Sequence, residues 1–108
     1  MSQFRGSLHH PMFKRAVHPG EVLREELEVL GVSPTAFARQ IDVPPNRISQ
    51  ILSGKRAVTG DTALRFGHWF GTDPRFWLNL QAQFDLAIAD RETGDAIRHL
   101  PTRTSLPL

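Results

Sequence analysis

Apolar residues recur at helical spacing through the middle of the chain and predict five helices. The expected helices cover about residues 19–30, 34–41, 45–53, 60–70 and 74–90, and the periodic pattern ends at residues 91–94. The sequence therefore predicts an all-α, compact five-helix domain at residues 18–93. Residues 1–17 and 94–108 are predicted to be tails, either disordered or ordered on a partner, with disorder favoured in the free protein.

Residues with special backbone preferences mark the helix ends. Ser33 can accept a hydrogen bond from a free amide as an N-cap, and Pro34 fits the first helical position after it. The segment from Asp42 to Pro45 interrupts the apolar stripe, so a new helix must begin at Pro45, and Gly54 ends that helix. The same reasoning assigns Thr59 and Asp73 as N-caps and Gly31 and Gly71 as C-terminal stops.

The apolar faces of the first four helices are expected to form the core. Its predicted members are Val22, Leu23, Leu27, Leu30, Phe37, Ala38, Ile41, Ile48, Ile51, Leu52, Ala63, Leu64, Phe66, Gly67 and Phe70.

The fifth predicted helix is apolar over most of its circumference, which is typical of a helix covered on more than one side. One stripe, expected to join the core, contains Phe76, Trp77, Leu80, Phe84, Ala87 and Ile88. A second stripe contains Leu78, Ala82, Leu86 and Ala89. We expect this second stripe to meet a second copy of the chain in a homodimer. The alternative is a helix that is fully covered within one chain.

The polar face of the helix at residues 45–53 combines amide, guanidinium and hydroxyl side chains, which are types that can contact the bases of DNA. Asn46 and Gln50 carry amides that can bond bidentately to adenine, and Arg47 can fork onto guanine. Four basic residues and one acid between residues 31 and 60 give this region a local charge of +3, whereas the whole chain carries only +2. The alternative interpretation is an ordinary solvated helix face.

The composition disfavours several other classes of protein. With no cysteine among its 108 residues, the chain cannot form disulfides or thiolate zinc sites. The five histidines lack metal-ligand spacing apart from the His9-His10 pair, and no glycine loop suited to phosphate is present, so neither an enzyme, a metal site nor a cofactor is expected. No apolar run approaches membrane-span length and no secretion signal is evident, so a cytoplasmic protein is expected.

Residues 18 to about 89 resemble the HigA/VapI-type antitoxins, a branch of the lambda-repressor-like (XRE) helix-turn-helix regulators. The helix-turn-helix itself is SPTAFARQIDVPPNRISQILSG, at residues 33–54. The motifs HPGEVLREE and TALRFGHWFGTDPRFWLNLQ are much more specific than a helix-turn-helix alone. The resemblance implies an antitoxin that binds a HigB/RelE-like toxin, a ribosome-dependent mRNA endonuclease, and represses its own operon through a palindromic operator. A stand-alone repressor without a toxin is the alternative.

The resemblance also implies residue roles. Base-edge contacts fall on Pro45, Asn46, Arg47, Ser49 and Gln50, and phosphate contacts on Pro34, Thr35, Arg39, Ser53, Lys55 and Arg56. Since proline has no side-chain donor, Pro45 leaves base reading to its neighbours. A toxin that works on RNA is expected to be basic, so the acidic residues Glu21, Glu25 and Glu28 are the candidate docking surface, with the two tails as rivals. The protein is expected to associate with the nucleoid when bound to DNA.

Overall fold

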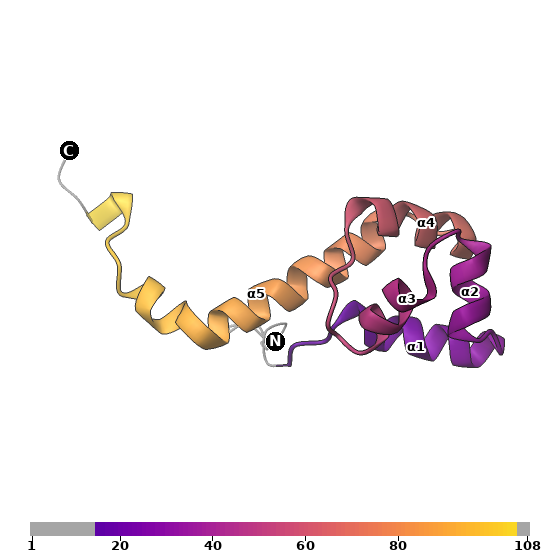
Figure 1. Ribbon diagram of the computed structural model, residues 1–108. Coiled ribbons are helices and arrows are strands. Elements are labelled where there is room, and N and C mark those ends of the chain that lie inside the picture. The colour runs from indigo at the N-terminus through magenta and orange to yellow at the C-terminus, as the bar shows by residue number, and fades with distance from the viewer. Residues whose placement is uncertain (1–14, 106–108) are drawn as a thin grey trace.

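The computed structural model describes residues 15–105, which contain five α-helices and one short 3-10 turn. The elements are α1 (Pro19–Leu30), α2 (Pro34–Gln40), α3 (Pro45–Leu52), α4 (Gly60–Phe70), α5 (Arg75–Arg98) and η2 (Arg103–Ser105). Helix α3 packs against α1 and α2, while α5 packs against α1 and α4 (Figure 1). The predicted all-α, five-helix fold is confirmed. The predicted tail residues 1–14, including His9 and His10, and residues 106–108 lie outside the described residues.

Most predicted helix ends are confirmed by their hydrogen bonds and backbone angles. The Ser33 hydroxyl accepts from the Ala36 amide at 3.1 Å, as expected of an N-cap. Asp42 takes the left-handed conformation in the turn between α2 and α3, with φ of 59°. Asp73 Oδ1 accepts from the Arg75 amide at 2.9 Å and so caps α5. Thr59 occupies the predicted N-cap position of α4, but its side chain makes no capping bond to the backbone and instead contacts the Thr62 hydroxyl at 3.4 Å.

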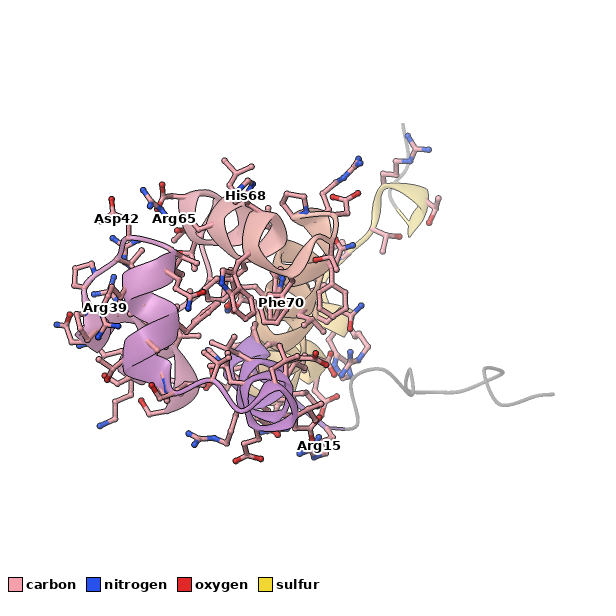
Figure 2. All side chains as sticks on the ribbon, turned by 90° about the vertical axis from the view of Figure 1, so that its right-hand side faces the viewer. Arg15, Arg39, Asp42, Arg65, His68 and Phe70 are labelled. Atoms are coloured by element: carbon pink, nitrogen blue, oxygen red, sulfur yellow. The ribbon has the colours of Figure 1, made fainter. Side chains whose placement is uncertain are left out.

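The core joins side chains from all five helices. Its buried members are Leu23, Leu27, Phe37, Ala38, Ile41, Val43, Ile48, Ile51, Val58, Ala63, Phe66 and Trp77. Phe66 is central, because its ring meets those of Phe37 and Trp77 at centroid distances of 5.4 and 5.0 Å. Figure 2 shows Phe70 directed into the same interior region.

Three residues predicted for the core are instead largely exposed. They are Leu30, Leu64 and Phe76, with exposed fractions of 52%, 63% and 45%. Leu30 is the last residue of α1, directly before the left-handed Gly31 that ends the helix. Leu64 lies beside the face of α4 that buries Ala63 and Phe66, and no other helix of the described chain covers that side.

Helix α5 extends beyond the end near residue 90 that the sequence predicts. It continues to Arg98, and its last turns project away from the other helices (Figure 1). Gly94 lies inside α5, and one ionic contact spans it: the Arg98 guanidinium contacts Asp90 at 2.6 Å across Gly94, and it also contacts Asp95 at 2.8 Å. The extended helix gives the molecule its long dimension of 57 Å.

The first turn of α1 touches the end of α3 backbone to backbone. A Cβ atom added to Gly20 would collide with the Ile51 carbonyl oxygen and lie 2.8 Å from the Ile51 carbonyl carbon and 3.1 Å from Leu52 Cα. Only glycine permits this approach. The position of α3 against α1 therefore depends on the glycine of the HPGE segment.

Candidate nucleic-acid interface

The residues predicted to contact DNA lie on one continuous region formed by α2, the turn, α3 and the loop after it. Asn46 and Ser49 are exposed on α3, with Gln50 and Arg47 half-buried beside them. The predicted phosphate contacts Pro34, Thr35, Arg39, Ser53, Lys55 and Arg56 are all exposed, as is Pro45. Figure 2 shows Arg39 on the outer edge of this region. The fold thus brings the predicted base-contacting residues and the predicted phosphate-contacting residues together on α2, α3 and the loop after α3.

The Gln50 side chain is held by the loop that follows α3. Its Oε1 accepts from Arg56 Nε at 2.8 Å. The backbone carbonyl of Gln50 accepts from the Lys55 amide at 2.8 Å and from the Ser53 hydroxyl at 3.1 Å, which closes the end of α3. The loop that carries the predicted phosphate contacts is thereby tied to a predicted base-reading residue.

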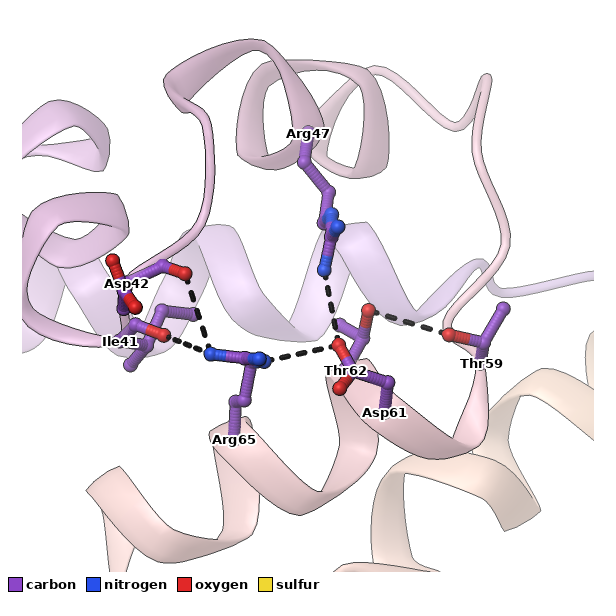
Figure 3. Close-up of polar contacts among 7 residues, drawn as sticks. All are labelled: Ile41, Asp42, Arg47, Thr59, Asp61, Thr62 and Arg65. Carbon is purple, nitrogen blue, oxygen red and sulfur yellow. Dashed lines mark hydrogen bonds and ion pairs between the residues drawn. The ribbon is translucent and has the colours of Figure 1, made fainter.

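Arg47 is engaged with α4 rather than directed freely into solvent. Its Nη1 lies 3.1 Å from Asp61 Oδ2, and the same oxygen accepts from Arg65 Nε at 2.9 Å (Figure 3). The hydrogen bond from Arg65, helped by the charges of both arginines, holds the pKa of the Asp61 carboxyl below its usual range. Reading a base with Arg47 therefore requires exchange of this partner.

Arg65 is absent from the predicted site residues, yet it fixes the turn of the helix-turn-helix. Its Nη1 donates to the carbonyl oxygens of Ile41 at 2.9 Å and Asp42 at 3.3 Å (Figure 3). These carbonyls lie beyond the last turn of α2, where backbone acceptors lack helical partners. Arg65 also lines, with Arg47, Arg56 and the Asp61 carboxylate, a hollow beside the loop.

Two buried polar side chains, Gln81 and His18, lie on the inner side of the loop at residues 53–59, and neither role is predicted from the sequence. Gln81 of α5 is 7% exposed, and its Oε1 accepts from the Val58 amide at 2.8 Å. His18 is 6% exposed and caps α1, because its Nδ1 accepts from the Gly20 amide at 2.9 Å. The Glu21 carboxylate accepts in return from the His18 amide at 3.2 Å. Glutamate three residues after the cap is a capping-box signal that the sequence did contain.

The imidazole of His18 is favoured in its neutral form. Burial lowers the pKa of His18 from its ordinary value of 6.5, against the raising influences of the Glu21 carboxylate, the Arg56 backbone and the Asp85 carboxylate. The ring packs edge to face on Phe84 of α5, with centroids 4.8 Å apart. A neutral ring can accept through Nδ1, which the cap of α1 requires.

The acidic residues proposed for toxin docking differ in availability. Glu21 is engaged by the His18 cap and by Arg15, whose guanidinium lies 2.9 Å from its carboxylate. Glu25 and Glu28 are exposed on α1. Nearby, an apolar groove is lined by Val22, Glu26, Phe70, Thr72, Phe76 and Trp77.

The four residues proposed for the dimer contact are not equivalent. Ala82, Leu86 and Ala89 are exposed on α5, with Leu86 55% exposed. Leu78 is half-buried and packs against the core of its own chain. The exposed part of the stripe therefore begins one turn later than Leu78.

Residues 15–105 contain no group of three or more histidine, cysteine, aspartate or glutamate side chains that could hold a metal ion. In the same range, no helix combines the length and apolar character needed to cross a bilayer.

Several known proteins are similar to this chain over most of its length. Residues 23–77 match the helix-turn-helix family model. The virulence-associated protein I of Dichelobacter nodosus is 46% identical over 78 residues, covering 71% of this chain and 72% of that protein. Among solved structures, an addiction module antidote protein of the HigA family from Coxiella burnetii has a TM-score of 0.80 and 45% identity, covering 82% of this chain and 97% of that one. The Pseudomonas aeruginosa antitoxin HigA, solved with the higBA promoter, has a TM-score of 0.78 and 38% identity over 82% of this chain and 98% of its own.

Proposed function

Because the chain belongs to the XRE-type helix-turn-helix family, with HigA antitoxins among the proteins most like it, we propose that it is the antitoxin of a type II toxin–antitoxin module and represses its own operon. In this role it binds a palindromic operator as a homodimer and neutralises a HigB/RelE-like toxin. The observation that carries the DNA-binding part is the exposed polar face of α3, which adjoins the basic loop at residues 53–59.

In the proposed complex, α3 enters the major groove. Asn46 and Gln50 then face base edges, where an amide pairs with adenine. Lys55 and Arg56 meet the phosphates beside the groove and set the register of α3, but they read no sequence.

Substitutions separate the two kinds of contact. Asn46→Ala is expected to weaken binding to the operator by about 1–3 kcal/mol and to scrambled DNA much less, because alanine cannot bond to a base edge. Lys55→Ala is expected to weaken binding to both DNAs similarly. It is also expected to lower the slope of log affinity against log salt by about 0.9, the contribution of one phosphate contact. Fluorescence anisotropy with both duplexes over a salt series measures these effects. If Asn46→Ala weakened binding to the operator and to scrambled DNA equally, as Lys55→Ala is expected to do, the assignment of Asn46 as a base contact would be contradicted.

The acidic face of α1 is the proposed toxin contact. Glu25 and Glu28 are exposed and take no part in the cap that engages Glu21, and they lie on the helix that borders the apolar groove. An RNA-cleaving toxin is expected to be basic, and opposite charge speeds and orients association. The double substitution Glu25→Lys/Glu28→Lys is expected to weaken toxin binding, whereas Glu92→Lys, an exposed acid on α5, is the matched control.

Growth of cells tests the antitoxin role directly. The small reading frame adjacent to this gene is expressed with and without this chain in trans. Growth arrest relieved by the chain is the expected outcome. Absence of toxicity from a neighbour that is demonstrably expressed would instead favour a stand-alone repressor, and the DNA-binding proposal would still stand.

A further inference from the structure

The loop between α3 and α4, residues 53–59, is anchored at two points that lie on either side of its basic residues. At one end, Gly54 lies beside the His18 ring, since a Cβ atom added to Gly54 would be 3.9 Å from His18 Cγ, and the His18 imidazole has a hydrogen bond with the adjoining backbone of the loop. At the other end, the buried Val58 amide donates to Gln81 Oε1 at 2.8 Å. Lys55 and Arg56 lie between the two anchors and are exposed.

Both anchors meet on one face of α5. Gln81 and Asp85 are one helical turn apart, and Gln81 Nε2 donates to Asp85 Oδ1 at 3.0 Å. This bond directs the amide oxygen of Gln81 toward Val58. Phe84, on the same face, supports the His18 ring edge to face. A helix outside the proposed DNA-contacting region therefore determines where the loop lies.

We propose that Gln81, with His18, positions the loop so that Lys55 and Arg56 reach the DNA phosphates while α3 occupies the groove. This inference rests on the proposed DNA-binding function. Gln81 touches no DNA in this scheme and acts only through the loop. Removal of the anchor leaves the Val58 amide without its buried acceptor, and the loop then departs from the position that the phosphates require.

The variant Gln81→Met tests the anchor, because methionine has a similar shape and no polar group. Gln83→Met is the matched control, since Gln83 is exposed on the same helix. Anisotropy titrations use DNA from upstream of this gene and a scrambled duplex over a salt series. Gln81→Met is expected to weaken binding to both duplexes and to lower the slope of log affinity against log salt by about 0.9 for each phosphate that the loop no longer reaches. Gln83→Met is expected to match the wild type.

A compensating double variant with the net charge of the wild type distinguishes loss of loop positioning from a general failure to fold. Gln81→Glu keeps the acceptor for Val58 but places a carboxylate against Asp85, so it should bind DNA poorly at neutral pH. The double variant Gln81→Glu/Asp85→Asn reverses the donor and acceptor of this pair, restores both hydrogen bonds and should regain the wild-type salt slope. This comparison tests the anchor even if Gln81→Met does not fold.

The outcomes separate the positioning role of Gln81 from the function on which it rests. If the wild type fails to prefer upstream DNA over the scrambled duplex, the proposed function is wrong. If the wild type binds and folded Gln81→Met retains its affinity and salt slope, the positioning role is overturned. A double variant that keeps the reduced slope of Gln81→Glu would also overturn it.

Discussion

Gly20→Ala is expected to destabilise the protein, although alanine ordinarily favours helix. An alanine Cβ would meet the backbone of Ile51 and Leu52 rather than a flexible side chain, so relief requires α1 and α3 to separate. Overpacking of this kind costs about 1–3 kcal/mol, and a rigid backbone neighbour places the cost near the upper end, about 3 kcal/mol. The higher helix propensity of alanine offsets up to about 1 kcal/mol. The net expected decrease in unfolding free energy is about 2 kcal/mol.

Urea unfolding followed by circular dichroism measures this decrease, and thermal unfolding should show a midpoint lower by about 10 °C for a domain of this size. The control is Gly60→Ala at the start of α4, where an added Cβ would meet nothing within 4 Å. That variant should be neutral or more stable by up to about 1 kcal/mol. A Gly20→Ala protein as stable as the wild type would refute the claim that this glycine sets the approach of α3 to α1.

Three further predictions concern pH, assembly and the turn. Because the folded state lowers the pKa of His18 below 6.5, the unfolded chain binds the proton more readily. The unfolding free energy should thus fall as pH drops through 6.5 toward the lower folded pKa, and His18→Asn, which keeps a cap acceptor, should remove this component from a pH series of urea midpoints. Leu86→Glu should convert a homodimer to monomers in sedimentation at micromolar concentration, and a wild type already monomeric there would contradict the proposed contact. Arg65→Met should lower the urea midpoint, because the carbonyls of Ile41 and Asp42 lose their donor, and an unchanged midpoint would show that water replaces it fully.

The helix ends are predictable where the signal is local. Ser33 before proline and Gly71 after the last apolar residue act within their own turn, so neighbouring residues suffice to identify them. Asp42 suits the turn because aspartate visits the left-handed region more readily than most residues, and its φ of 59° agrees. The residues proposed to contact DNA can be grouped from the sequence because they are close together along the chain.

The features that the sequence does not predict depend on contacts between distant residues. Gln81 and Val58 are 23 residues apart, and nothing in either segment indicates that they meet. The bond between Arg98 and Asp90 joins residues eight apart on either side of Gly94, where the local pattern predicts an end of the helix. Periodicity also cannot tell which side of a short helix is covered, which is why it assigns Leu64 to the core.

The bond between Arg56 and Gln50 would affect how α3 distinguishes one base from another in the proposed complex. While Arg56 donates to the amide oxygen of Gln50, one of the two lone pairs of that oxygen is taken and the oxygen is held toward the loop, so the N–H donors of Gln50 are its more available groups, and they suit acceptors present on several bases. The oxygen would accept from the amino group of adenine more readily once Arg56 moves away, for instance to a phosphate. Binding of Arg56 to a DNA phosphate would then change Gln50 from a donor that accepts several bases as partners to a residue that pairs bidentately with adenine. Selectivity at that base would thus be acquired after the first encounter, once Arg56 has released the Gln50 amide.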